Sequence, residues 1–117
     1  MATDIHAKLR YCGVSAQKVR LVIDTVRGRP AVDALNVLKF TTKVAARHVH
    51  RLLSSVVANA EENFGVSRDD LFIYEITADE APTRKWRRFG ARGRFKPILR
   101  RQSHISVVLR ERTSAVK

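Results

Sequence analysis

One stretch of this sequence, from Pro82 to Arg110, carries ten positive charges and contains no Asp or Glu. The ten cationic residues are Arg84, Lys85, Arg87, Arg88, Arg92, Arg94, Lys96, Arg100, Arg101 and Arg110. They account for nearly all of the formal net charge of +12, so the rest of the chain is almost balanced. Because concentrated like charge repels itself and weakens a compact fold, we expect the stretch to face a polyanion, most commonly a nucleic-acid backbone.

The composition is that of a folded protein of one domain. The chain has 117 residues, of which 44% are hydrophobic and 29% charged, which argues against wholesale disorder. No apolar run approaches the ~20 residues that span a bilayer, and the first residues lack a signal-peptide pattern, so we expect a cytoplasmic protein. The lone cysteine, Cys12, excludes an internal disulfide and a cysteine-based zinc site. The sequence pI near 11.1 leaves nucleic acid, an anionic membrane surface or an acidic protein as partners.

Alternation of apolar and polar residues predicts strands near both ends of the chain. A third strand is expected over residues 71–76, which are rich in β-branched and aromatic side chains. The apolar positions of the alternating strands are Ile5, Ala7, Leu9 and Tyr11 in the first strand and Ile105, Val107 and Leu109 in the last. We expect these side chains to face the core.

Three helices are predicted between the first two strands. Ser15 is the expected N-cap of the first, which should end at Gly28, and Pro30 should open the second at its first helical position. Thr41 or Thr42 should cap a longer third helix over about residues 43–63, closed by Gly65.

The cationic stretch lies between two predicted strands and has Gly90 and Gly93 at its centre, which suits the turn of an antiparallel hairpin. The predicted fold class is therefore α+β: three helices packed on a small antiparallel sheet, with a long protruding β-hairpin. We expect one domain with a globular body, about residues 1–81 and 102–112, and an extended hairpin, about residues 82–101.

Catalytic and metal-binding patterns are weak. Ser103, His104 and Asp79 suggest a triad, but Ser103 and His104 should point to opposite faces of one strand. His48 and His50 face different ways on a helix and lack a companion at ligand spacing. Asp79 and Glu80 could pass for an acid/base pair, yet adjacent strand residues point apart. The glycine-containing loop lacks the Lys-Ser/Thr continuation of a nucleotide-binding loop. We expect no enzyme, no metal and no cofactor.

Trp86, Phe89 and Phe95 lie among the arginines, where they could stack on bases or pack across the hairpin; both possibilities stay open. A long cationic projection suits threading between folded RNA segments. A basic DNA-binding dimer that uses the short helix pair is the main alternative. An RNA-modifying enzyme would need a convergent polar site, and a membrane-surface protein would need an amphipathic cationic helix.

Several motifs resemble the L-twenty-two family of large-subunit ribosomal proteins, of the bacterial type. The run from Ser15 to Arg29 resembles the first-helix signature of that family. Further matching groups follow in the same order along the chain: Ala58-Asn59-Ala60 with Asn63, Glu80 with Pro82 and Lys85, Ala91-Arg92-Gly93-Arg94, and Arg101 with Ser103-His104-Ile105. The match is collinear from about Ile5 to Arg112.

The resemblance implies a structural, non-enzymatic constituent of the large ribosomal subunit. Such a protein binds large-subunit ribosomal RNA, assists subunit assembly, contacts neighbouring ribosomal proteins, and lines the polypeptide exit tunnel with its hairpin tip, where it meets the nascent peptide and influences macrolide response. We expect neither membrane association nor a homo-oligomer. By resemblance, Lys18, Arg20, Arg27, Arg101 and His104 face RNA on the body and hairpin base.

The full set of expected RNA-binding residues joins these five to the cationic stretch. It is Lys18, Arg20, Arg27, Arg84, Lys85, Trp86, Arg87, Arg88, Arg92, Arg94, Lys96, Arg100, Arg101 and His104. The expected tunnel-lining tip is Arg88, Phe89, Gly90, Ala91, Arg92 and Gly93.

The chain departs from the family pattern at a few positions. Ala16-Gln17 stands where a Pro-Arg pair is usual, which removes one cation from the first helix. Trp86 and Gly90 replace basic residues, Phe89 replaces a proline and Phe95 a small residue. The tip is therefore expected to be bulkier and more aromatic, with its charge moved to Arg87 and Arg88.

Overall fold

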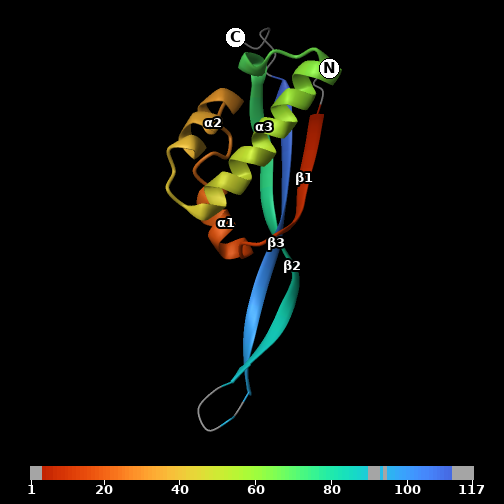
Figure 1. Ribbon diagram of the computed structural model, residues 1–117. Helices are drawn as coiled ribbons and strands as arrows, with labels where there is room; N and C mark the ends of the chain where they lie inside the picture. Colours follow the sequence, from red (N-terminus) through yellow and green to blue (C-terminus); the bar gives the residue numbers. More distant parts are fainter. Residues whose placement is uncertain (1–3, 90–92, 94, 112–117) are drawn as a thin grey trace.

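The sheet of this protein has three antiparallel strands, and the last strand in sequence lies in the middle. In the computed structural model, which describes residues 4–89, 93 and 95–111, β1 is Asp4–Cys12, β2 is Leu71–Phe89 and β3 is Phe95–Glu111. Their order is β1-β3-β2. The molecule is elongated, with extents of 69 × 24 × 21 Å, because β2 and β3 continue far beyond the body (Figure 1).

The predicted hairpin is formed by β2 and β3. β1 pairs with β3 from Asp4↔Arg110 to Cys12↔Ser103. β2 pairs with β3 over a longer stretch, from Leu71↔Glu111 to Phe89↔Phe95. From Arg84↔Arg100 outward, the two strands therefore pair only with each other. Gly93 has a φ of 73°, in the left-handed region that glycine enters without strain.

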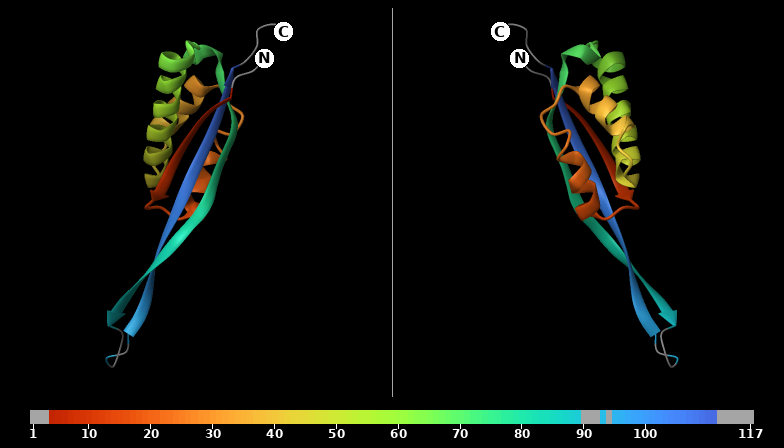
Figure 2. Two further views of the ribbon diagram at one scale, coloured as in Figure 1. Left: turned by 90° about the vertical axis from the view of Figure 1, so that its right-hand side faces the viewer. Right: turned by 90° about the vertical axis from the view of Figure 1, so that its left-hand side faces the viewer.

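Three helices cover one face of the sheet, as the views of Figure 2 show. They are α1 (Ala16–Ile23), α2 (Ala31–Lys39) and α3 (Val44–Phe64), and a short 3-10 turn, η1 (Arg68–Asp70), precedes β2. The predicted α+β class, with three helices, a small antiparallel sheet and a long hairpin, is confirmed.

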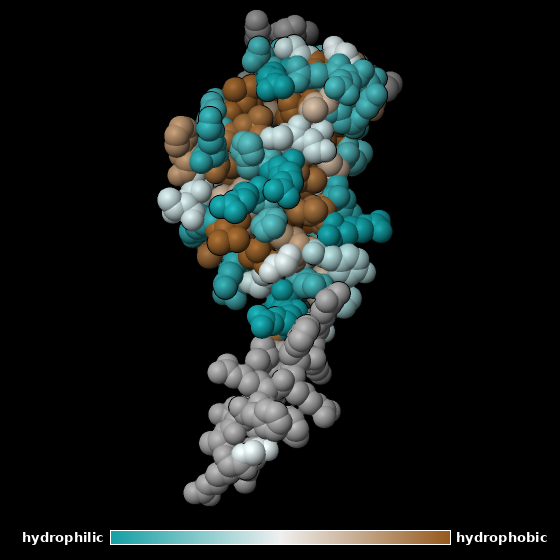
Figure 3. Space-filling model, viewed as in Figure 1, coloured by the Kyte–Doolittle hydropathy of each residue, from teal (hydrophilic) through white to brown (hydrophobic). Residues whose placement is uncertain are grey.

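The core lies between the helices and the sheet. On β3, Ile105, Val107 and Leu109 are buried as their alternation predicts. On β2, a register shift between Ile73 and Glu75 places an extra residue in the strand, which is why Ile73 and Ile76 are both buried despite odd spacing. The main buried residues contributed by α3 are Ala45, Val49, Leu52, Leu53, Val56, Val57 and Ala60. Apolar patches remain on the helix-covered face among charged side chains (Figure 3).

Two predicted helix ends around the first turn were wrong by a few residues. α1 ends at Ile23 rather than at Gly28, and residues 24–28 form a tight turn that Gly28 closes with a φ of 79°. Pro30 is the N-cap of α2 rather than its first helical residue. The left-handed glycine was thus correctly assigned, but a turn separates it from the helix.

The start of α3 also differs from the prediction. Thr41 donates its hydroxyl back to the carbonyl of Val37 at 2.7 Å, so it belongs to the end of α2. Lys43 is the N-cap of α3, with no side-chain cap hydrogen bond. Gly65, with a φ of 64°, ends α3 as predicted.

Tyr11 corrects the predicted core face of the first strand. A register shift between Leu9 and Cys12 turns the Tyr11 side chain outward, where it is 61% exposed, and Cys12 takes the buried position. The Tyr11 backbone has a φ of 57°, unusual for a bulky residue. Its N–H donates to Nδ1 of His104 at 3.0 Å, and the two rings meet edge to face with centroids 4.8 Å apart. This tertiary contact overrides the local alternation.

We propose that the body folds without the outer hairpin, because the buried core residues lie within residues 5–81 and 103–109. Replacing residues 84–97 by Asn-Gly should leave one cooperative transition in urea, measured by circular dichroism. Leu109→Ala, which empties a fully buried site, should cost about 2–5 kcal/mol as a positive control. Loss of cooperative unfolding in the deletion variant would contradict the proposal.

Candidate nucleic-acid interface

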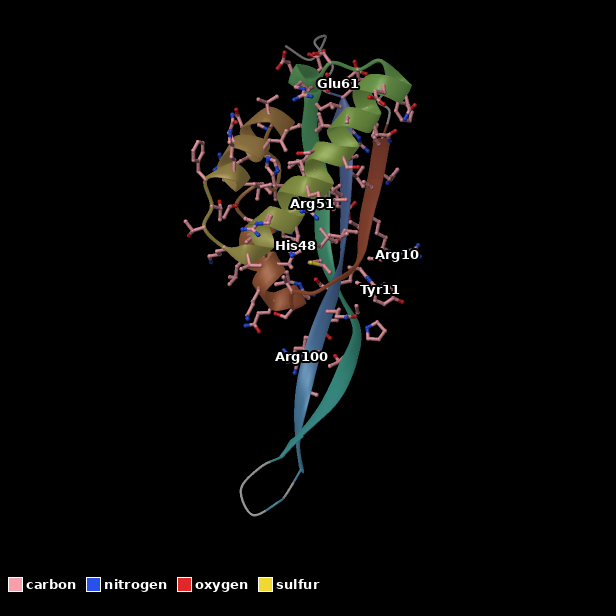
Figure 4. All side chains as sticks on the ribbon, in the orientation of Figure 1. Arg10, Tyr11, His48, Arg51, Glu61 and Arg100 are labelled. Carbon is pink, nitrogen blue, oxygen red and sulfur yellow. The ribbon has the colours of Figure 1, made fainter. Side chains whose placement is uncertain are left out.

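Four acidic residues gather at the end of the body that lies away from the hairpin. Exposed Glu61 and Glu62 close α3, and exposed Asp69 and Asp70 lie in the 3-10 turn beside them. Arg100 lies at the base of the hairpin, at the other end of the body from Glu61 (Figure 4). The four acidic groups at the Glu61 end of the body are therefore largely screened from the hairpin at physiological ionic strength. Asp79 and Glu80 are the exposed acidic residues that lie on β2 close to the hairpin base.

Arg110, the last cation of the stretch, has a carboxylate partner within the protein. Its Nε and one Nη lie 2.7 and 3.1 Å from the carboxylate oxygens of Asp4, and its guanidinium stacks 3.4 Å from the ring centroid of Tyr74. The hydrogen bond from Arg110 lowers the pKa of Asp4, and the same bond raises the pKa of Arg110. Arg110 is thus matched within the protein, and the surplus charge ends at Arg101.

Arg100 and Arg101 are exposed where β3 leaves the body. Among the described residues the ion pairs are Arg27–Asp24, Arg68–Glu61 and Arg110–Asp4, and none of them involves Arg100 or Arg101. The guanidinium groups at the hairpin base have no carboxylate partner in this part of the protein. They are free to bind an external anion.

Arg20 on α1 and Arg27 in the turn after it are two expected RNA-facing residues, and part of each guanidinium group holds this segment to β2. Arg20 donates from Nε to the carbonyl of Ala78 at 3.1 Å. Arg27 donates to the carbonyl of Ile76 at 3.0 Å and pairs with Asp24 at 2.5 Å. These contacts join elements about fifty residues apart in sequence, so both arginines have a structural task besides any contact with RNA.

Lys18, by contrast, is exposed on α1. Together with Arg100 and Arg101 it lines an open groove of about 1030 Å³ at the base of the hairpin. Lys43, which is not among the predicted site residues, lines the same groove. The structure therefore brings three predicted site residues together and adds a fourth cation that the sequence reading missed.

His104 lies on the sheet face opposite the helices, half-buried, and its Nδ1 accepts the Tyr11 N–H. The proton of the neutral ring is therefore on Nε2, which faces away from that bond and can donate to an acceptor. Tyr11 is the aromatic residue that this arrangement exposes, and the sequence had assigned it to the core.

The predicted tunnel-lining tip is Arg88, Phe89, Gly90, Ala91, Arg92 and Gly93. Gly90, Ala91 and Arg92 lie outside the described residues, as does Arg94 of the predicted RNA-binding set. For residues 84–89 and 95–98 the structure describes the backbone. The predicted contacts of Arg84, Lys85, Trp86, Arg87, Arg88 and Lys96 therefore stay predictions.

The catalytic alternatives fail on geometry. Ser103 is fully buried and donates its hydroxyl to the carbonyl of Val14 at 2.7 Å. His104 and Asp79 are paired across β2 and β3, with their side chains on the other face of the sheet from Ser103. Within the described ranges, no three His, Cys, Asp or Glu side chains are grouped as a metal would require. No helix in that part of the chain is long and apolar enough to cross a membrane.

A comparison with protein families identifies the relatives of this chain. Residues 7–110 match the family described as ribosomal protein L22p/L17e. The chain belongs to this family. It is also 50% identical over 106 residues, which are 91% of this chain and 87% of the relative, to the large ribosomal subunit protein uL22 of Caldicellulosiruptor saccharolyticus.

Membership of the uL22 family confirms the resemblance that the sequence motifs indicated. The matched region includes α1 with Lys18 and Arg20, the following turn with Arg27, the whole hairpin, and the β3 residues Arg101 and His104. This is a family of ribosomal structural proteins rather than of enzymes.

In this uL22-family protein, Arg20 and Lys18 are exposed on the same helix, but they differ in their contacts: Arg20 bonds to a carbonyl of β2, and the side chain of Lys18 has no ion pair or hydrogen bond among the described residues. Arg20→Met should lower the free energy of unfolding by about 1 kcal/mol, because the bond to Ala78 is lost. Lys18→Met, at an exposed site on the same helix, should change it by less than about 0.5 kcal/mol. Urea unfolding of the two variants measures the difference, and equal stability of both would contradict the structural role of Arg20.

The Asp4–Arg110 pair predicts a defined pH dependence. Because the folded pKa of Asp4 is lowered from 3.8, the pair stabilises the fold above that pH and loses its effect as the pH falls through the folded value. Asp4→Asn should therefore be less stable than the native protein at neutral pH, and the difference should vanish in acid. Urea titrations at a series of pH values measure this. Asp79→Asn is the control, since Asp79 has no ion pair in the described part of the chain; a constant difference for Asp4→Asn would contradict the prediction.

Proposed function

We propose that this protein is a structural constituent of the large ribosomal subunit that binds large-subunit ribosomal RNA through its hairpin and hairpin base. As a uL22-family member, the protein is located on the ribosome in the cytoplasm. The observation that carries the proposal is the concentration of positive charge in the two-stranded β2/β3 extension and its turn. Nine Lys and Arg lie between Arg84 and Arg101, with no acidic residue among them.

The physical role of the extension follows from its shape and charge. RNA segments that approach one another repel through their phosphates, and an arginine between them can bridge oxygens of both strands. A narrow ribbon that pairs only with itself can enter such a gap, whereas a body with helices on one face cannot. The hairpin is thus suited to join RNA segments during subunit assembly.

The proposed position of the protein within the large subunit rests on the family resemblance. In this proposal the hairpin tip, around Arg88 to Gly93, lines the polypeptide exit tunnel and meets the nascent peptide, while the body contacts RNA and neighbouring ribosomal proteins at the subunit surface. The exposed acidic groups at the far end of the body support this orientation, because phosphates would repel them.

The DNA-binding alternative has less support. Its recognition element would be α2, whose sequence Ala31–Lys39 carries one Asp and a single Lys in its last turn. A groove-reading helix needs several cationic or amide side chains directed at base edges. The charge of this protein lies instead at the base of the hairpin and along it.

Salt dependence tests the number of phosphate contacts. With about nine contacts, log affinity for large-subunit RNA should fall by roughly 6–8 per tenfold rise in salt. Replacing residues 84–97 removes seven of the nine hairpin cations and should reduce this slope to about 2. Filter binding at several salt concentrations measures both slopes, and a native slope of about 2–3 would contradict the proposal.

Co-sedimentation provides the control for specificity. The native protein should travel with the large subunit on a sucrose gradient and be released at high salt, and it should not show a preference for duplex DNA at equal phosphate concentration. Dimerisation with preferential binding to duplex DNA would favour the alternative.

A further inference from the structure

The groove at the base of the hairpin is a separate surface from the hairpin arms. Its walls come from the start of α1, the start of α3 and the segment of β3 where the strand leaves the body. Both helices begin at this end of the molecule in Figure 1. The lining residues are Gly13, Val14, Ser15, Lys18, Leu21, Thr42, Lys43, Val44, Ala45, Leu99, Arg100, Arg101 and Gln102.

The groove carries four positive charges and no negative one. Lys18, Lys43, Arg100 and Arg101 come from three different elements, and no lining residue is acidic. All four are exposed, and none of the ion pairs in the described part of the chain uses them. Four cations around one cavity repel each other unless an anion lies between them.

The backbone adds to this positive field. α1 and α3 both begin at the groove, and neither has an acidic residue in its first turn nor a side-chain cap on its free N–H groups. The unbonded N–H groups of a helix start attract anions, phosphates above all. The four cationic side chains and the two helix starts together favour the binding of a phosphate-type anion.

The groove also has exposed apolar side chains, which a free phosphate ion would not contact favourably. Leu21, Val44 and Leu99 line it and are 57%, 69% and 46% exposed. Leu21 lies off the buried stripe of α1, so burial in the core does not explain it. A bound nucleotide offers both parts of a complementary ligand: a phosphate for the cations, and a sugar or base face for the apolar side chains.

We propose that this groove binds an unpaired nucleotide of RNA together with its two flanking phosphates. A regular duplex presents phosphates on its outside and keeps its base faces stacked, so it would leave the apolar wall exposed. A nucleotide in a bulge or loop offers its phosphates to the cations and an unstacked base face to the apolar side chains. The inference deepens the proposed function, since it assigns one contact within the RNA-binding surface, and it differs from hairpin insertion because it uses the body.

The test compares two doubly substituted full-length proteins of equal charge. Lys43→Gln/Arg101→Gln removes two groove cations, and Lys39→Gln/Arg51→Gln removes two exposed cations outside the groove. If each groove cation contacts one phosphate, the groove variant should bind a uridine oligonucleotide roughly 20-fold more weakly at about 0.1 M salt and lose about 1.5 from the salt slope. For an RNA duplex of equal length, the two variants should bind alike.

Crosslinking locates the contact. RNA of the large subunit that contains 4-thiouridine should crosslink under ultraviolet light to peptides that contain Leu21, Val44 or Leu99. Melting curves of both variants should match that of the native protein, because the substituted side chains make no described ion pair.

The outcomes separate this inference from the proposed function. If the native protein fails to bind large-subunit RNA, the proposed function falls and the inference with it. If the native protein binds with the steep salt slope while the groove and control variants behave alike, only the groove assignment is overturned. Crosslinks from these residues to an acidic protein segment in the intact subunit, instead of to RNA, would also overturn it.

Discussion

The separation of charge along the molecule is the constraint on which the rest of the structure depends. The segment from Arg84 to Arg101 carries nine cations, while the described acidic side chains lie on the body, several of them at its far end. Charges so far apart are screened from each other by salt. No acidic residue lies between Arg84 and Arg101, so the charge of this segment can be balanced only by groups outside it, and the buried core that the structure describes lies in the body. Both conditions suit a protein whose fold is completed within an RNA assembly.

The stability of the body comes from a core between one sheet face and three helices, and polar side chains fix how these layers meet. Arg20 and Arg27 bond α1 and its following turn to carbonyl groups of β2. Ser103 bonds β3 to the segment before α1, and His104 accepts a hydrogen bond from the outward-turned end of β1. These bonds converge on the end of the body where the hairpin leaves. They fix the position of the two long strands relative to the body, because each bond joins elements far apart in sequence.

The same end of the body presents its free cations to solvent. Arginine is used there in two ways: Arg20 and Arg27 bond to the protein's own backbone, whereas Arg100 and Arg101 have no ion pair among the described residues. Sequence alone treats these four residues as equivalent positive charges. The structure therefore separates arginines that bond to the protein's own backbone from arginines whose guanidinium groups are exposed without an ion pair in the described part of the chain.

The sequence by itself determined the fold class, the hairpin, the alternating core face of β3 and the family, because charge, periodicity and motif order are local properties of the chain. It did not determine which carbonyl Arg20 reaches, the pairing of Arg110 with Asp4 106 residues away, the outward turn of Tyr11, or the groove that joins Lys18 to Arg101. Those features depend on strand register and on how the helices lie on the sheet. A one-residue shift in a strand exchanges its faces, so only the tertiary contacts could decide them.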